Sequence, residues 1–224
     1  MTPAARIAAA ITVLDDILGG LRAEQALAAW ARNSRYAGSK DRAALRDLVF
    51  DALRKRASCA ALGGGLHGRG LMVGLGYSED WDMAAFFSGE GHAPAQLSAA
   101  EAELGPAPPD LTASEQDDLP AWLLPIWYAD LGDAAQAAAQ CLRRRAPLYL
   151  RVNLARGTLA DARAALAAES IATEPHTEQA GCLVVTANPR RVKLSAPYAD
   201  GLVEIQDAAC LLYTSDAADD VSTV

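Results

Sequence analysis

Cysteine and histidine are scarce in this 224-residue sequence, which contains four and three of them. The cysteines lie far apart, and none has a second cysteine or a histidine at metal-ligand spacing. The sequence therefore indicates neither a disulfide framework nor a zinc site. No apolar run approaches the ~20 residues that a membrane-spanning helix needs, and the first residues lack the pattern of a secretory signal. We expect a cytoplasmic protein that binds no metal and no membrane.

Positive charge is missing from the middle of the chain. Residues 70–142 contain no Lys or Arg but 12 Asp or Glu. In contrast, residues 1–69 carry 11 basic and 6 acidic residues, and residues 143–205 carry 9 and 6. The net charge of −8 therefore hides two basic segments. Because a polyanion responds to the local field, the acidic average does not exclude RNA.

The first part of the chain is predicted to be helical. Apolar residues recur at helical spacing from Pro3 to Leu18, and a second, shorter helix is expected over Arg22–Arg32. Ser39 is expected to cap a third helix, which runs to about Leu62 and stops at three consecutive glycines. Short buried helices are expected at Leu71–Leu75 and Met83–Phe87.

The end of this helical part is rich in tryptophan and alanine. The segment Pro120–Leu131 is expected to pack into the helical core with its tryptophans, and Pro125 either starts or kinks its helix. Asp133 is expected to cap an Ala-rich helix that ends at the triplet Arg143–Arg145. The favourable position of arginine in a last helical turn explains this triplet as well as RNA contact does.

A change of pattern near Ala146 predicts a second domain. Leu148–Val152 alternates like a strand, and Thr158 opens a helix that extends to about Glu169. Two further strands are expected near Cys182–Thr186 and Leu202–Ile205. A strand, a helix and two strands in about 60 residues indicate a small α/β domain.

Four sequence motifs resemble those of a known family. The segment Gly38–Val49 (GSKDRAALRDLV) resembles the NusB-like RNA-binding domain. The later segments Leu119–Leu124 (LPAWLL), Pro147–Asn153 (PLYLRVN) and Gly201–Ala209 (GLVEIQDAA) follow in the order and spacing of the RsmB/NOP family of S-adenosylmethionine-dependent ribosomal RNA cytosine-5 methyltransferases. The resemblance covers residues 1 to about 209.

The resemblance implies a mainly α chain in three parts. Residues 1–145 would form a NusB-like helical RNA-binding bundle, and residues 146–209 a small α/β domain of partial ferredoxin-like or RRM-like type. The catalytic Rossmann-like domain, which holds S-adenosylmethionine in the family and would be the intramolecular partner of both, is expected to be absent from this chain. Residues 210–224 depart from the family pattern and are expected to be a non-native, disordered tail.

Catalytic residues of the family type are missing from the sequence. Its four cysteines do not stand in the family's catalytic dipeptides, and no Gly-rich loop lies between a strand and a helix. We therefore assign no catalytic, cofactor-binding or metal-binding residue and expect this chain alone to bind no cofactor and to transfer no methyl group.

RNA binding is the activity that the sequence retains under this interpretation. The resemblance implies small-subunit ribosomal RNA as the partner, and Lys and Arg side chains that contact phosphates would supply the affinity. The basic residues cluster around the third predicted helix and in the α/β domain. The candidates are Lys40, Arg42, Arg46, Arg54, Lys55, Arg56, Arg151, Arg190, Arg191 and Lys193.

Two other functions remain open at this point. A stand-alone transcription antitermination factor of the NusB type would explain residues 1–145, but not the motifs after Pro147. A protein-interaction bundle could use the acidic middle segment, although no particular residue supports it. Each alternative keeps the helical first part and differs in what the second part is for.

Overall fold

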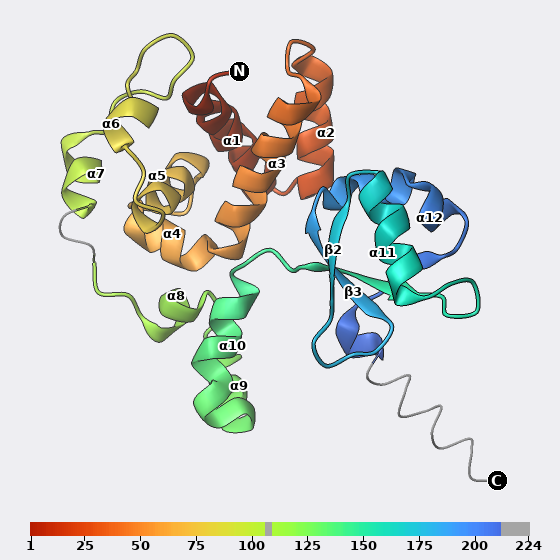
Figure 1. Cartoon of the computed structure of the whole chain (residues 1–224). Coiled ribbons are helices and arrows are strands. Elements are labelled where there is room, and N and C mark those ends of the chain that lie inside the picture. The colour runs from red at the N-terminus through yellow and green to blue at the C-terminus, as the bar shows by residue number, and fades with distance from the viewer. Residues whose placement is uncertain (106–108, 212–224) are drawn as a thin grey trace. The chain divides into compact units, whose positions relative to one another are not determined.

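The computed structural model describes residues 1–105 and 109–211 of the chain. The chain divides into two compact units, one formed by Met1–Arg145 and the other by the chain from Ala146 on. The first unit is helical, and the second combines helices with a sheet (Figure 1). No helix in the described ranges is long and apolar enough to cross a membrane.

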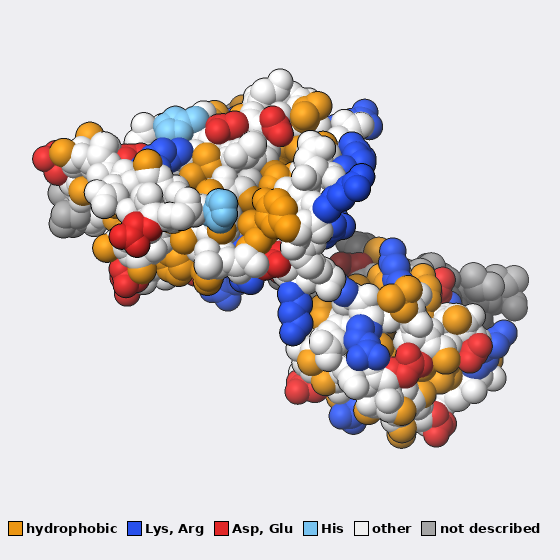
Figure 2. All heavy atoms as spheres, turned by 90° about the horizontal axis from the view of Figure 1, so that it is seen from above, with side chains coloured by type: hydrophobic (Ala, Val, Ile, Leu, Met, Phe, Trp, Pro, Cys, Tyr) orange, Lys and Arg blue, Asp and Glu red, His pale blue; other side chains and the backbone are white. Residues whose placement is uncertain are grey.

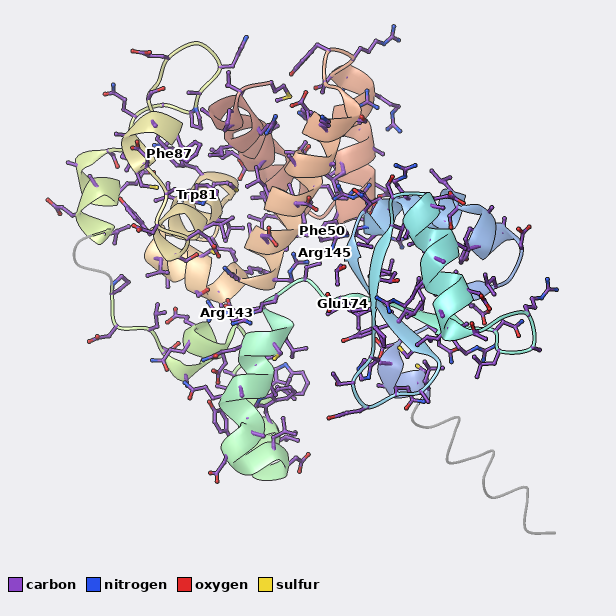
Figure 3. All side chains as sticks on the ribbon, in the orientation of Figure 1. Phe50, Trp81, Phe87, Arg143, Arg145 and Glu174 are labelled. Carbon is purple, nitrogen blue, oxygen red and sulfur yellow. The ribbon has the colours of Figure 1, made fainter. Side chains whose placement is uncertain are left out.

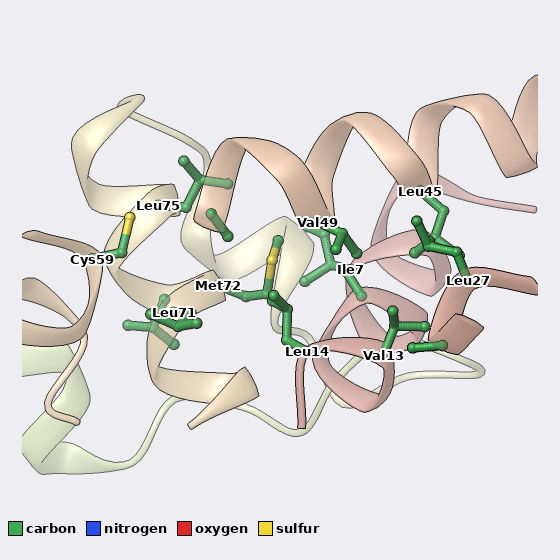
Figure 4. Packing of buried hydrophobic residues seen from close by; sticks show 14 of the residues in the cluster. Ile7, Val13, Leu14, Leu27, Leu45, Val49, Cys59, Leu71, Met72 and Leu75 are labelled. Carbon is green, nitrogen blue, oxygen red and sulfur yellow. The ribbon is translucent and has the colours of Figure 1, made fainter. Parts of the chain in front are cut away.

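Five helices build the body of the first unit. They are α1 (Pro3–Leu18), α2 (Ala23–Asn33), α3 (Ser39–Arg54), α4 (Arg56–Leu62) and α5 (Gly68–Ser78). Helix α1 packs against α2, α3 and α5. Its apolar stripe therefore lies at the centre, where Val13, Leu14, Val49 and Met72 are completely buried (Figure 4). The helical pattern predicted for Pro3–Leu18 is confirmed to the residue.

The prediction of one continuous third helix to Leu62 is wrong. At Lys55 the backbone leaves the helical region with φ −110° and ψ 33°, so α3 ends at Arg54 and α4 begins at Arg56. The break allows α4 to turn and pack against α5. Local sequence gives no sign of it, because the apolar spacing continues across the break.

Glycines bring the backbones of α4 and α5 into direct contact. A Cβ atom on Gly63 would lie 1.8 Å from the carbonyl oxygen of Gly70, and one on Gly74 would lie 1.9 Å from that of Cys59. Both distances are far below van der Waals contact, so no side chain fits at either position. Gly63 thus does more than end a helix: it lets α5 approach closely.

Shorter helices complete the first unit. They are α6 (Met83–Phe86), α7 (Ala99–Leu104), α8 (Ala113–Asp117), α9 (Leu124–Leu131), the 3₁₀ turn η1 (Gly132–Ala134) and α10 (Ala135–Leu142). Ser98 caps α7 in a capping box with Glu101. Pro125 lies in the first turn of α9 and starts this helix rather than kinking it. The predicted cap at Asp133 is wrong, since Asp133 lies inside η1 and α10 begins two residues later.

The prediction that Pro120–Leu131 packs into the core is also wrong for two of its large apolar residues. Trp122 is 71% exposed and Ile126 is 54% exposed. Trp127 is half-buried, and its indole nitrogen donates a hydrogen bond to the carbonyl oxygen of Ala135 at 2.9 Å. This contact joins α9 to the start of α10. These two helices therefore pack mainly on each other, which hydrophobic content alone does not reveal.

The second unit contains a four-stranded antiparallel sheet. Its strands are β1 (Leu148–Val152), β2 (Ala172–Pro175), β3 (Cys182–Ala187) and β4 (Val203–Ile205), arranged in the order β2-β3-β1-β4. Helix α11 (Leu159–Ala168) lies between β1 and β2, while η2 (Pro189–Leu194) and α12 (Ala196–Ala199) lie between β3 and β4. This strand order with these two crossovers is ferredoxin-like. The predicted strand Leu148–Val152 is confirmed, whereas β2 was not predicted.

The two faces of this sheet carry different residues. Leu150, Leu183 and Val203 point to one side and form a buried core with Leu166 of α11. Tyr149 and Cys182 belong to a second, smaller cluster, with Ala208 and Leu211. The expected non-native tail of residues 210–224 lies outside the described residues from position 212 on, and Leu211 itself is buried in this second cluster.

Candidate nucleic-acid interface

Four of the ten candidate cations lie on α3, which is amphipathic. Leu45, Val49 and Ala52 of this helix are buried, so the opposite side of the helix faces outward. The outward positions hold Lys40, Arg42, Arg46 and Arg54, and Lys55 and Arg56 follow at the break before α4. The structure therefore brings these six residues onto one helix and its end, as the sequence predicted.

Three of these six cations have acidic partners within the protein. Arg46 lies 2.9 Å from a carboxylate oxygen of Glu24 in α2, and both side chains are largely exposed. Arg54 pairs with Asp51, and Lys55 pairs with Glu79 of the segment after α5. An exposed pair such as Arg46–Glu24 contributes little to stability, but all three pairs reduce the charge that is available to a phosphate. Arg46, Arg54 and Lys55 are thus weaker candidates than their charge suggests.

The start of α3 is different. Lys40 and Arg42 are exposed there, as is Arg56 at the start of α4, and none of the three pairs with a carboxylate in the part of the chain that the structure describes. The Nε atom of Arg42 donates to the carbonyl oxygen of Ala37 at 3.1 Å, which fixes this arginine against the turn before α3. The acidic neighbour Asp41 is already engaged: its carboxylate lies 3.2 Å from the α-amino group of Met1 and 2.9 Å from Arg6.

The engagement of Asp41 also affects its ionisation. Burial opposes the charged form, but hydrogen bonds from Met1 and Arg6 outweigh it and lower the pKa of Asp41. The carboxylate therefore stays ionised and remains bound to its own partners. It ties the first turn of α3 to the start of α1, which places Lys40 and Arg42 next to the first residues of the chain.

Sequence reasoning missed three residues at the corner between α2 and α3. Arg32 lies in the last turn of α2, and Arg35 and Tyr36 follow it; all three are exposed, Tyr36 by 73%. Figure 2 looks onto this end of the helical unit and shows a row of Lys and Arg side chains beside hydrophobic ones. The signal that could have found them is the density of the segment Arg32–Arg42, in which four of 11 residues are basic. We call Arg32, Arg35, Tyr36, Lys40 and Arg42 the corner surface.

One arginine of the triplet at the end of α10, Arg143, contacts neighbouring helices. Arg143 donates to the carbonyl oxygen of Gln116 at 3.1 Å and to the hydroxyl of Ser58 at 3.3 Å, and its Nε lies 2.8 Å from Asp118 (Figure 3). The Nε–H is not aligned for a hydrogen bond, so the contact with Asp118 is an ion pair. The side chain of Asp118 is only 2% exposed. Arg143 thus joins α10 to α8 and α4.

The other two arginines of the triplet are exposed. Arg145 lies 3.4 Å from Asp47, and Arg144 has no carboxylate partner among the described residues. With Lys55 and Arg143 they line a hollow of about 720 Å³, which also contains the acidic side chains of Asp51 and Glu79. These acids balance part of the positive charge, and the hollow is therefore less suited to a polyanion than the corner surface.

The remaining four candidates lie in the second unit. Arg151 projects from β1 and lies 3.2 Å from Glu204 of β4, and both side chains are exposed. Arg190, Arg191 and Lys193 are exposed on η2, whose Val192 is buried in the core beneath them. These three form a group of their own within the second unit.

The buried cysteines have the properties of core residues. Burial, and to a lesser extent the nearby Asp118, raise the pKa of the Cys59 thiol to about 12. Burial also raises the pKa of Cys182. A thiol with a raised pKa carries almost no thiolate at neutral pH and is a poor nucleophile. Across the described ranges, no three His, Cys, Asp or Glu side chains are grouped as a metal site would require.

Comparisons with known proteins agree with the fold of the second unit. Residues 119–192 match the family model described as the Methyltr_RsmF/B-like, ferredoxin-like domain. The solved crystal structure of PH0851 is similar to this chain with a TM-score of 0.53 at 15% sequence identity. The likeness covers 92% of this chain and 53% of PH0851, so this chain spans about half of that length. No curated protein matches the chain.

Together, the fold and the match show that residues 119–192 are similar to the ferredoxin-like domain of the RsmF/B-like methyltransferase family. The matched range is notable because it begins before the sheet. It includes α9 and α10 as well as β1, α11, β2 and β3. The resemblance that the sequence indicated from its short motifs is thus supported in the region of Leu119–Leu124 and Pro147–Asn153.

Proposed function

We propose that this chain is the RNA-binding portion of a ribosomal RNA cytosine-5 methyltransferase of the RsmB/NOP type. The observation that carries the proposal is the match of residues 119–192 to the RsmF/RsmB-like domain, together with the ferredoxin-like strand order β2-β3-β1-β4. In this proposal the NusB-like helical unit and the ferredoxin-like unit hold small-subunit ribosomal RNA for a methyl-transfer domain. A stand-alone antitermination factor would leave the matched range without an explanation.

The residues present do not fit the cofactor S-adenosylmethionine. The glycines at 63–65 follow a helix, and the backbone of α5 occupies the space beside Gly63. They therefore form no cofactor-binding loop. The sheet is antiparallel, whereas a Rossmann-like domain binds its cofactor at the ends of parallel strands. In this proposal the cofactor and the methyl-transfer step belong to a catalytic domain and not to the two units described.

The corner surface is the part of the chain best suited to phosphates. Its cations are exposed and have no carboxylate partner within residues 1–105 and 109–211, so binding RNA there disrupts no ion pair of these ranges. The acidic residues of the chain are concentrated elsewhere in the sequence, in residues 70–142. Affinity from such a surface depends on released counterions and falls as salt rises. This dependence gives the proposal a quantitative test.

The test compares two sets of substitutions in the full chain. Binding to a fragment of small-subunit ribosomal RNA with a single-stranded loop is measured by filter retention over a series of salt concentrations. Each lost phosphate contact reduces the slope of log K against log salt by about 0.7 for single strands, so replacing Arg32, Arg35 and Lys40 by Ala should reduce it by about 2.

The matched control replaces Arg46 and Arg54 by Ala. Because these arginines are already paired with Glu24 and Asp51, we expect a change in slope of less than 1. Absence of RNA binding by the wild-type chain, or binding that does not respond to salt, would contradict the proposed function. Equal effects of both sets would remove the corner surface as its location.

A further inference from the structure

A hollow lies beside the corner surface in the helical unit. It has a volume of about 880 Å³, within the range of sites that bind small ligands. Its lining includes short side chains along α1, such as Ala8 and Ala9, together with Trp30, Tyr36 and the loop Glu90–Ala93. The same end of the unit faces the viewer in Figure 2, where hydrophobic side chains lie next to basic ones.

Tyr36 is the most unusual residue of this hollow. Its side chain is 73% exposed, and within the described ranges it forms no hydrogen bond and no contact with another ring. A single exposed aromatic residue is not remarkable on a protein surface. Here, however, the ring borders a hollow that also contains Trp30, and Arg35 precedes it directly. Aromatic faces beside basic side chains are the combination on which unpaired bases stack.

The charge around the hollow favours a polyanion. Arg32, Arg35 and Lys40 are exposed on the segment that leads into and out of Tyr36. Glu90 is the acidic residue of the lining, and it lies on the loop Glu90–Ala93 rather than on the segment of Tyr36. Asp41 is occupied by Met1 and Arg6 and adds little free negative charge. The side of the hollow formed by the corner therefore has a positive local potential.

We propose that this hollow accepts an unpaired base of single-stranded RNA. The base would stack on Tyr36, with Trp30 forming the wall beside it, while the adjoining phosphates would contact Arg32, Arg35 and Lys40. A base inside a duplex is stacked on both sides and cannot enter, so the site selects single strands or loops. This inference rests on the proposed function and adds the chemistry by which the corner surface recognises its RNA.

The experiment measures binding of a fluorescently labelled RNA octanucleotide to the full chain by fluorescence anisotropy. Base stacking on one aromatic ring corresponds to roughly 5- to 150-fold in affinity, so we expect Tyr36→Ala to weaken binding by about tenfold. Tyr36→Phe keeps the ring and should bind like the wild type. Trp122→Ala removes another exposed ring, 71% accessible and outside the hollow, and should have no effect.

A second oligonucleotide separates stacking from phosphate contact. An abasic octanucleotide keeps every phosphate but has no bases, and it should bind the wild type and Tyr36→Ala equally. If Tyr36→Ala binds the normal octanucleotide as the wild type does, or loses the same affinity for the abasic one, the inference is overturned while the proposed function stands. If the wild type binds neither oligonucleotide at any salt concentration, both are overturned.

Discussion

The buried carboxylate of Asp118 should be the most sensitive polar position of the helical unit. Its two oxygens accept hydrogen bonds from the backbone nitrogen and the hydroxyl of Ser58, each at 2.8 Å, and one of them lies 2.8 Å from Arg143. Replacing it with Ala leaves a largely buried guanidinium without its counter-charge, which costs about 3–5 kcal/mol in comparable cases. We expect Asp118→Ala to lower the free energy of unfolding by at least about 3 kcal/mol.

The conservative variant Asp118→Asn separates charge from shape. Asp118 adopts a left-handed backbone conformation with φ +53°, which asparagine tolerates better than alanine does. The amide can still accept a hydrogen bond from Ser58, but it cannot neutralise Arg143. Its cost should therefore be smaller than that of Asp118→Ala, about 1–3 kcal/mol.

Urea titration followed by tryptophan fluorescence is a suitable assay. All four tryptophans lie between residues 30 and 127, so the signal reports on the helical unit. Asp130→Ala, at an exposed carboxylate of α9, is the control and should change stability by less than about 0.5 kcal/mol. A loss of less than about 1 kcal/mol for Asp118→Ala would refute the reasoning, because the ion pair would then contribute no more than an exposed one.

Two further changes test the packing and the ionisation of this unit. Gly74→Ala would place a Cβ atom 1.9 Å from the carbonyl oxygen of Cys59, so we expect a loss of at least about 2 kcal/mol in urea titration, against less than about 1 for Gly38→Ala, where the nearest atom is 3.8 Å away. The hydrogen bond from Arg69 lowers the pKa of Glu101 from 4.5 to about 2. Because the pKa of Glu101 is lower in the folded than in the unfolded protein, its carboxylate stabilises the fold above pH 4.5, and this stabilisation is lost as the pH falls towards 2. Glutamine does not ionise, so Glu101→Gln should flatten the decline of Tm between these pH values. A decline as steep as that of the wild type would exclude this role.

The sequence predicts those parts of the fold that depend on local signals. The strand Leu148–Val152 alternates clearly, and Thr158 opens the predicted helix through a capping box with Asp161. In contrast, the break at Lys55 follows from the contact of α4 with α5, which no window of neighbouring residues contains. Strand β2 escaped prediction because it has four residues, of which Thr173 is the buried one, and ends in proline.

The candidate interface shows the same division. Charge clustering located the outward positions of α3, and the structure places them there. The ion pair between Arg46 and Glu24 joins residues 22 positions apart, so the sequence could not reveal that this arginine is partly neutralised. Tyr36 was overlooked because its segment has no periodic pattern from which burial or exposure of the ring could be predicted. Exposure is a property of the folded corner.

The strand order of the ferredoxin-like sheet also bears on how this unit meets other chains. The order leaves β2 and β4 at the two margins, where backbone groups could pair with a foreign strand. β2 is irregular between Ala172 and Thr173 and ends at Pro175, while β4 has only three residues and presents Glu204. Short, irregular and charged margins are how natural sheets resist aggregation. This unit should therefore recognise its partners through side chains rather than by extending its sheet.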